Sequence, residues 1–121
     1  INMETLIIHD GTERTKDCLQ NFTPDFDFIF LECDFAESAD TALGWLQKKE
    51  FQQIIIAGES VDVREIKEGD FIPYNFLKEI SKLNFPKTRM LLVSPDSDFV
   101  NKGRLIADFF KVHTESHLLR K

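Results

Sequence analysis

The chain has 121 residues, of which 42% are hydrophobic and 30% are charged, and its formal net charge is -6. This composition is typical of one globular domain with its own core, and no apolar run approaches the ~18 residues that a membrane-spanning helix needs. The acidic balance excludes a general basic surface for nucleic acid, so we expect neither a membrane nor a nucleic acid as direct partner.

The ends of the chain indicate the limits of the domain, and its cysteines indicate its compartment. Met3 is interpreted as the natural start and residues 1–2 as a cloning remnant, so residues 3–121 are expected to form a single domain. The chain stops within a predicted helix, as it would if the domain were excised from a longer protein. Cys18 and Cys33 share no metal-type spacing and fit a reduced compartment, so we expect a cytoplasmic protein.

The first half of the chain alternates predicted strands and helices. Thr5–His9 is a short β-rich run, and the turn after it supplies a cap for a helix over residues 12–21. Phe28–Cys33 predicts a second strand, and Ser38 caps a second helix. The apolar residues of that second helix recur at helical spacing, as Ala39, Ala42, Leu43 and Leu46.

The run Phe51–Gly58 is the centre of the predicted sheet. Ile54, Ile55 and Ile56 follow one another, which indicates a strand that is covered on both faces. Such strands belong to parallel sheets with helices on each side, and the crevice at their carboxyl ends is the usual place for chemistry. Here that place holds Ala57 and a glycine, and neither side chain can react.

The second half of the chain begins with a long polar segment. Residues 59–74 predict a loop, which is longer than most connections in compact domains, and Pro73 can start the next helix. Arg89–Ser94 predicts a fourth strand, and a helix follows it with the apolar residues Phe99, Val100, Leu105 and Ile106. Phe109–Val112 predicts a fifth strand, and Thr114 caps a last helix with Leu118 and Leu119.

The alternation of strands and helices predicts the fold class. Five strands that alternate with five helices imply an α/β fold: a doubly wound, five-stranded parallel sheet with helices on both faces. For five such units the flavodoxin-like strand order 2-1-3-4-5 is the leading candidate.

The predicted strands resemble those of the receiver domain of two-component response regulators. The run that ends in His9-Asp10 resembles the family's first strand, which usually ends in two acidic residues, and only Asp10 fits. Residues 51–57 resemble its third strand, and Ala57 stands where the family has the phospho-accepting aspartate.

Two later segments extend this resemblance over most of the chain. Residues 91–94 are similar to the family's fourth strand, with Ser94 at the hydroxyl position. Residues 107–111 resemble its fifth strand, which carries a lysine after an aromatic residue. Depending on the register, that lysine is Lys111, or Val112 replaces it; we favour Lys111.

The resemblance implies a site that has lost its chemistry. An aspartyl-phosphate site needs a carboxylate nucleophile, a divalent cation held by carboxylates, and a hydroxyl and an ammonium group for the transferred oxygens. Ala57 offers no nucleophile, and His9 leaves Asp10 as the only first-strand carboxylate for a hard cation. We therefore expect a bacterial pseudo-receiver that is not an enzyme, needs no metal or cofactor, and signals through protein contacts.

Three alternatives stay open at the carboxyl end of the central strand. Glu59 or Asp62 could serve as a displaced phospho-acceptor, although carboxylates in loops are mostly solvated charges. The same crevice could instead hold a small molecule above Ala57. His9 could be a metal ligand or a pH sensor, but a hydrogen-bonded structural imidazole is the favoured interpretation.

Candidate contact residues for a protein partner lie in two segments. Phe99, Phe109 and Phe110 cluster around the fourth helix and the predicted fifth strand, where an exposed ring would be an anchor and buried rings would be core. The second segment is the long loop, with Glu59, Asp62 and Arg64. We expect the partner to be another protein, an output domain of the same chain, or a second copy in a homodimer.

Overall fold

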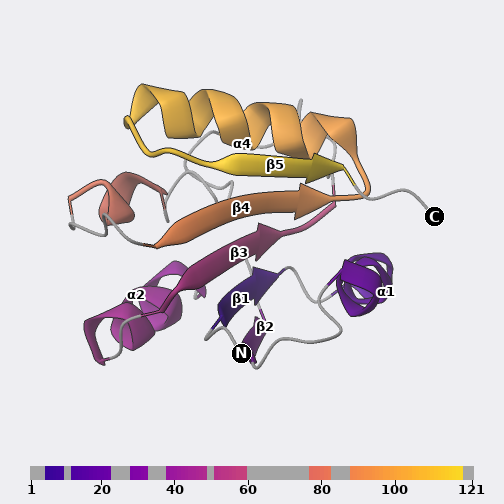
Figure 1. Cartoon of the computed structure of the whole chain (residues 1–121), viewed down its shortest axis with the longest axis horizontal. Coiled ribbons are helices and arrows are strands. Elements are labelled where there is room, and N and C mark those ends of the chain that lie inside the picture. The colour runs from indigo at the N-terminus through magenta and orange to yellow at the C-terminus, as the bar shows by residue number, and fades with distance from the viewer. Residues whose placement is uncertain are drawn as a thin grey trace.

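The chain folds into a parallel sheet with helices packed against it. The computed structural model describes residues 5–9, 12–22, 28–32, 38–48, 51–59, 77–82 and 88–118. The strands are β1 (Thr5–His9), β2 (Phe28–Glu32), β3 (Gln53–Ala57), β4 (Arg89–Ser94) and β5 (Glu115–Leu118). They pair in the order β2-β1-β3-β4-β5, and every pair is parallel (Figure 1). The predicted α/β class with a parallel sheet is confirmed.

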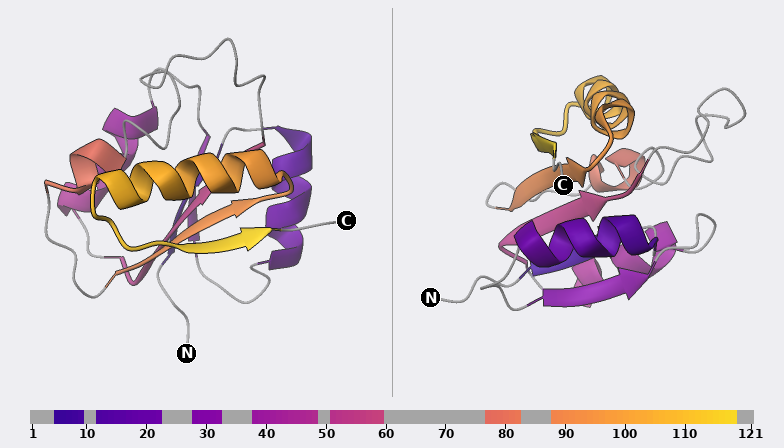
Figure 2. Two further views of the ribbon diagram at one scale, coloured as in Figure 1. Left: turned by 90° about the horizontal axis from the view of Figure 1, so that it is seen from above. Right: turned by 90° about the vertical axis from the view of Figure 1, so that its right-hand side faces the viewer.

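Helices lie on the two sides of this sheet. They are α1 (Glu13–Phe22), α2 (Ser38–Lys48) and α4 (Ser97–Phe109), and residues 77–80 are also helical. Figure 2 shows α1 and α2 on opposite sides of the strands. The start of α1 is capped, because the Thr12 hydroxyl accepts the backbone N–H of Thr15 at 3.3 Å.

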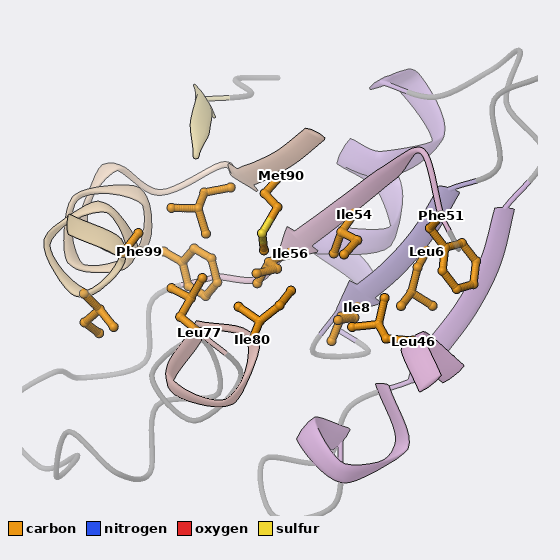
Figure 3. Packing of buried hydrophobic residues seen from close by; sticks show 13 residues of the cluster. Leu6, Ile8, Leu46, Phe51, Ile54, Ile56, Leu77, Ile80, Met90 and Phe99 are labelled. Atoms are coloured by element: carbon orange, nitrogen blue, oxygen red, sulfur yellow. The ribbon is translucent and has the colours of Figure 1, made fainter. Parts of the chain in front are cut away.

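The isoleucines of β3 join two separate parts of the core. Ile54 and Ile56 belong to the cluster that α2, residues 77–80 and α4 cover, which Figure 3 shows from close by. Ile55 points the other way, into a smaller cluster with Leu19 of α1. Since side chains alternate across a strand, consecutive apolar residues require two covered faces. The predicted central, doubly covered strand is confirmed.

The predicted fifth strand at Phe109–Val112 is wrong, because helix α4 continues to Phe109. The apolar face of α4 runs through Phe99, Ile106 and Ala107 to Phe110, which packs partly buried against the same cluster. This helical repeat outweighs the β-rich composition of the four residues, since burying that face stabilises the helix.

The end of α4 is a Schellman motif centred on Lys111. Lys111 has a left-handed backbone with φ of 60°. Its N–H donates to the Asp108 carbonyl at 3.1 Å, and the N–H of Val112 donates to the Ala107 carbonyl at 2.9 Å. These bonds satisfy two of the carbonyls that a helix end leaves without partners. Val112 packs against the core beside them.

The predicted last helix, with Thr114 as its cap, is also wrong, because residues 115–118 form β5. These residues carry little β propensity, so local sequence does not predict the strand. Tertiary contacts hold it instead: Arg89 of β4 donates to both carboxylate oxygens of Glu115, at 2.5 and 2.9 Å. Pairing with β4 then gives the strand its backbone hydrogen bonds.

Helix α4 lies close to β4 at a glycine. A Cβ atom on Gly103 would stand 2.9 Å from Cδ1 of Leu92, a residue that is fully buried. The glycine therefore permits the close approach of helix and sheet.

Several predicted features fall outside the described residues. These are the loop from residue 60 to 74, the helix start at Pro73, and Cys33. Cys18 is described and is a buried free thiol. Among the described helices, none is long and apolar enough to cross a membrane.

Candidate functional site

The carboxyl ends of β1, β3 and β4 meet at one edge of the sheet, and we call these strand ends and the segments next to them the crevice, after their place in sheets of this kind. His9 is the register partner of Ala57, and Ala57 is the partner of Val93, which precedes Ser94. Three of the sequence-predicted site residues, His9, Ala57 and Ser94, are therefore brought together at neighbouring strand ends. Asp10 lies outside the described residues.

Ala57 is part of the core. It is 4% exposed and belongs to the apolar cluster with Ile55, Leu91 and Leu19 of α1. An aspartyl-phosphate site would need an exposed oxygen nucleophile at this position, whereas the methyl group of Ala57 packs in the core. At this strand end the chain cannot form an acyl phosphate on residue 57.

His9 and Ser94 are buried on the two sides of this position. The Ser94 hydroxyl accepts the backbone N–H of Asp96 at 2.9 Å, so it supports the turn into α4. The burial of His9 at a strand end fits the structural interpretation of its imidazole.

Sequence reasoning missed a basic residue that faces this edge. Nη1 of Arg14, in the first turn of α1, lies 2.9 Å from a carboxylate oxygen of Asp96 and 3.7 Å from one of Glu59. Glu59 follows β3 and Asp96 follows β4, so one guanidinium joins three segments of the crevice. The available signal was an arginine in the first turn of a helix, where the helix dipole disfavours a cation.

Lys111 is not in the crevice, which corrects its predicted role as the pocket lysine. It lies in the turn after α4 and four residues ahead of Glu115, the first residue of the parallel strand β5, which pairs with Leu91 of β4. Lys111 is thus at the amino edge of the sheet. Leu118 pairs with Ser94 at the carboxyl edge. The alternative register, with Val112 in the lysine position, is equally wrong, because Val112 lies in the same turn.

The three candidate aromatic residues in α4 and at its C-cap have different environments. Phe99 is 5% exposed and lies in the core, and Phe110 is partly buried against it. Phe109 is 77% exposed, and its ring meets that of Phe110 edge to face, with centroids 5.1 Å apart. Leu105, one turn earlier on the same face, is 71% exposed. We call Leu105 and Phe109 the outer apolar face of α4.

Two further candidates cannot be placed relative to the strand ends. Asp62 and Arg64 lie outside the described residues. Among the residues that are described, no group of three or more histidine, cysteine, aspartate or glutamate side chains could hold a metal ion.

Comparison with family models, curated proteins and solved structures finds no match to this chain. The case for a function therefore depends on the geometry of the crevice and of α4.

Proposed function

We propose that this chain is a pseudo-receiver: a non-catalytic, flavodoxin-like signalling domain of a bacterial cytoplasmic protein that acts through protein contacts and without phosphorylation. The observation that carries the proposal is the buried methyl group of Ala57 at the end of β3. Because no oxygen nucleophile stands there, the crevice is expected to serve as structure, without a metal or cofactor.

The alternative proposal is a displaced phospho-acceptor, for which Glu59 is the described candidate. Its carboxylate lies 3.7 Å from the Arg14 guanidinium. A cation beside a carboxylate can also bind the oxygens of a transferred phosphoryl group, so this contact does not separate the two proposals. The alternative acceptor Asp62 lies outside the described residues.

The outer apolar face of α4 is the proposed contact surface. Large apolar side chains that stay in water on a helix are favoured anchors for a protein partner, since their burial supplies binding free energy. Phe109 and Leu105 are such residues, whereas Phe99 is committed to the core.

The first experiment tests phosphorylation independence. Backbone amide NMR spectra of the protein would be recorded with Mg²⁺ and beryllium fluoride, which mimics a phosphoryl group. We expect no shifts at Gly58, Glu59 or Ser94. Shifts centred there would overturn the proposal, and their loss in a Glu59→Gln variant would identify Glu59 as the acceptor.

The second experiment tests the contact surface. Proteins captured from the native cells by the wild-type domain would be compared with those captured by a Phe109→Ser variant. A partner that acts through α4 should be lost with Phe109→Ser and kept with Arg104→Ser, which changes an exposed residue of the same helix. Equal capture by all three proteins would contradict the assignment of this face.

A further inference from the structure

Arg14 and Asp96 each lie at the start of a helix, but neither makes the interaction that is usual for its charge at that position. Arg14 places a positive charge in the first turn of α1, where the aligned peptide dipoles favour a negative one. Asp96 occupies the N-cap position of α4, where a carboxylate ordinarily accepts a backbone N–H, but it makes no such capping bond.

The two side chains form an ion pair with each other, which accounts for both unusual positions. The Arg14 guanidinium lies 2.9 Å from the Asp96 carboxylate, and the same nitrogen is 3.7 Å from Glu59. The side chains of Glu59 and Asp96 are 29% and 23% exposed and that of Arg14 is 52% exposed, so the two carboxylates are partly shielded from water while the cation is half in solvent. The three residues come from α1, from the segment after β3 and from the segment before α4.

We propose that Arg14 is a built-in cation of the crevice, which ties the start of α1 to the ends of β3 and β4 and thereby sets the position of the first turn of α4. Asp96 connects Arg14 to the start of α4. Its carboxylate contacts Arg14, its N–H donates to Ser94 at 2.9 Å, and its carbonyl accepts the Val100 N–H at 3.5 Å.

This inference does not rest on the proposed function, because it concerns only contacts within the chain. It gives Arg14 a positioning role, because the guanidinium acts on α4 through its contact with Asp96. The helix that it positions carries Leu105 and Phe109 on its outer side.

The first test measures how tightly the guanidinium is held. Rotation of the Arg14 guanidinium group would be followed by ¹⁵N NMR in the wild type and in Asp96→Asn, with Arg104 as the internal reference. We expect rotation at least about threefold slower for Arg14 than for Arg104, and loss of that difference in Asp96→Asn, since a charge-assisted contact restrains the group. Equal rates for the two arginines in the wild type would overturn the proposal.

The second test asks whether the effect reaches α4. Arg14→Gln should shift the backbone amide signals of residues 97–100, and Arg14→Lys, which keeps the charge, should shift them less. Lys16→Gln is the matched control, because it removes the same charge from the same helix. Shifts confined to α1 in Arg14→Gln, or equal shifts at residues 97–100 in the control, would overturn the proposal.

Discussion

At the scale of single residues, Ala57 and Lys111 show that the crevice has neither a nucleophile at residue 57 nor the predicted lysine. Ala57 places a methyl group in the core at the end of β3, and Lys111 lies at the opposite edge of the sheet. The absence of a nucleophile at residue 57 could be predicted from the sequence, because strand β3 is recognisable by its isoleucines alone. The position of Lys111 could not, since it depends on where α4 ends.

The protein should be more stable with glycine in place of Lys111. The φ of 60° at this residue places Cβ close to the following carbonyl oxygen, a conformation that glycine adopts without strain. We expect Lys111→Gly to raise the free energy of unfolding by about 1 kcal/mol, measured by urea denaturation.

Lys111→Ala is the control for this substitution. Alanine removes the same side chain but keeps Cβ, so the strain persists and stability should change by less than about 0.5 kcal/mol. A gain in Lys111→Ala equal to that in Lys111→Gly would show that the side chain, and not the backbone, is responsible.

At the scale of elements, Gly103 decides how close α4 lies to the sheet. In an isolated helix Gly103→Ala would be favourable by about 1 kcal/mol. Here the new methyl group would stand 2.9 Å from Leu92, whose side chain is enclosed by the core. Overpacking of this kind costs about 1 to 3 kcal/mol, so we expect a net loss of stability in thermal or urea unfolding.

A double-mutant cycle separates the two effects at Gly103. In a Leu92→Val background the contacting δ-methyl groups are gone, and Gly103→Ala should become neutral or stabilising. If Gly103→Ala destabilises both backgrounds equally, the contact with Leu92 is not the cause.

The Arg89–Glu115 pair should make the attachment of β5 depend on pH. Hydrogen bonds from Arg89, and then its charge, hold the pKa of Glu115 below its usual value of 4.5, and the same pair raises the pKa of Arg89. Because the folded-state pKa is lowered, the stabilisation is present above the unfolded pKa and is lost as the pH falls through the folded one.

The comparison of wild type with Glu115→Gln measures this contribution. The difference between their urea midpoints should be present at pH 7, shrink as the pH falls below 4.5, and diminish in high salt, since the pair is exposed. A difference that does not vary between pH 7 and pH 3 would contradict the assignment.

The misplacement of β5 shows where local pattern stops being informative. Residues 109–112 look like a strand in composition but complete a helix, because Phe110 continues the buried face of α4. Residues 115–118 look helical or irregular but form a strand, because β4 offers an unpaired edge and Arg89 binds Glu115. Both outcomes depend on contacts between distant segments, which periodicity does not contain.

At the scale of the whole molecule, stability should reside in the two-sided burial of β3. Ile55→Ala removes a side chain with no exposed surface and should lower the free energy of unfolding by about 2 to 5 kcal/mol. Leu105→Ala on the outer face of α4 should change it by less than about 0.5 kcal/mol, because that side chain is already in water. Similar losses for the two variants in urea unfolding would contradict this distribution of the core.

Most of the α/β architecture could be predicted from the sequence, because β1, β3 and β4 carry unbroken apolar runs and α1, α2 and α4 carry recognisable caps or stripes. Of the crevice, only the missing nucleophile at Ala57 could be predicted. Its charged contacts could not, since Arg14, Glu59 and Asp96 are far apart in the chain and meet only once the strands are in order.

The shortness and polarity of β5 also affect the behaviour of the protein in concentrated solution. The outermost strand of a sheet can recruit a strand from another molecule and so begin a fibril. β5 has four residues, Glu-Ser-His-Leu, and its first carboxylate is bound by Arg89. A strand this short and hydrophilic is a poor template for such growth, so the β5 edge of the sheet discourages aggregation.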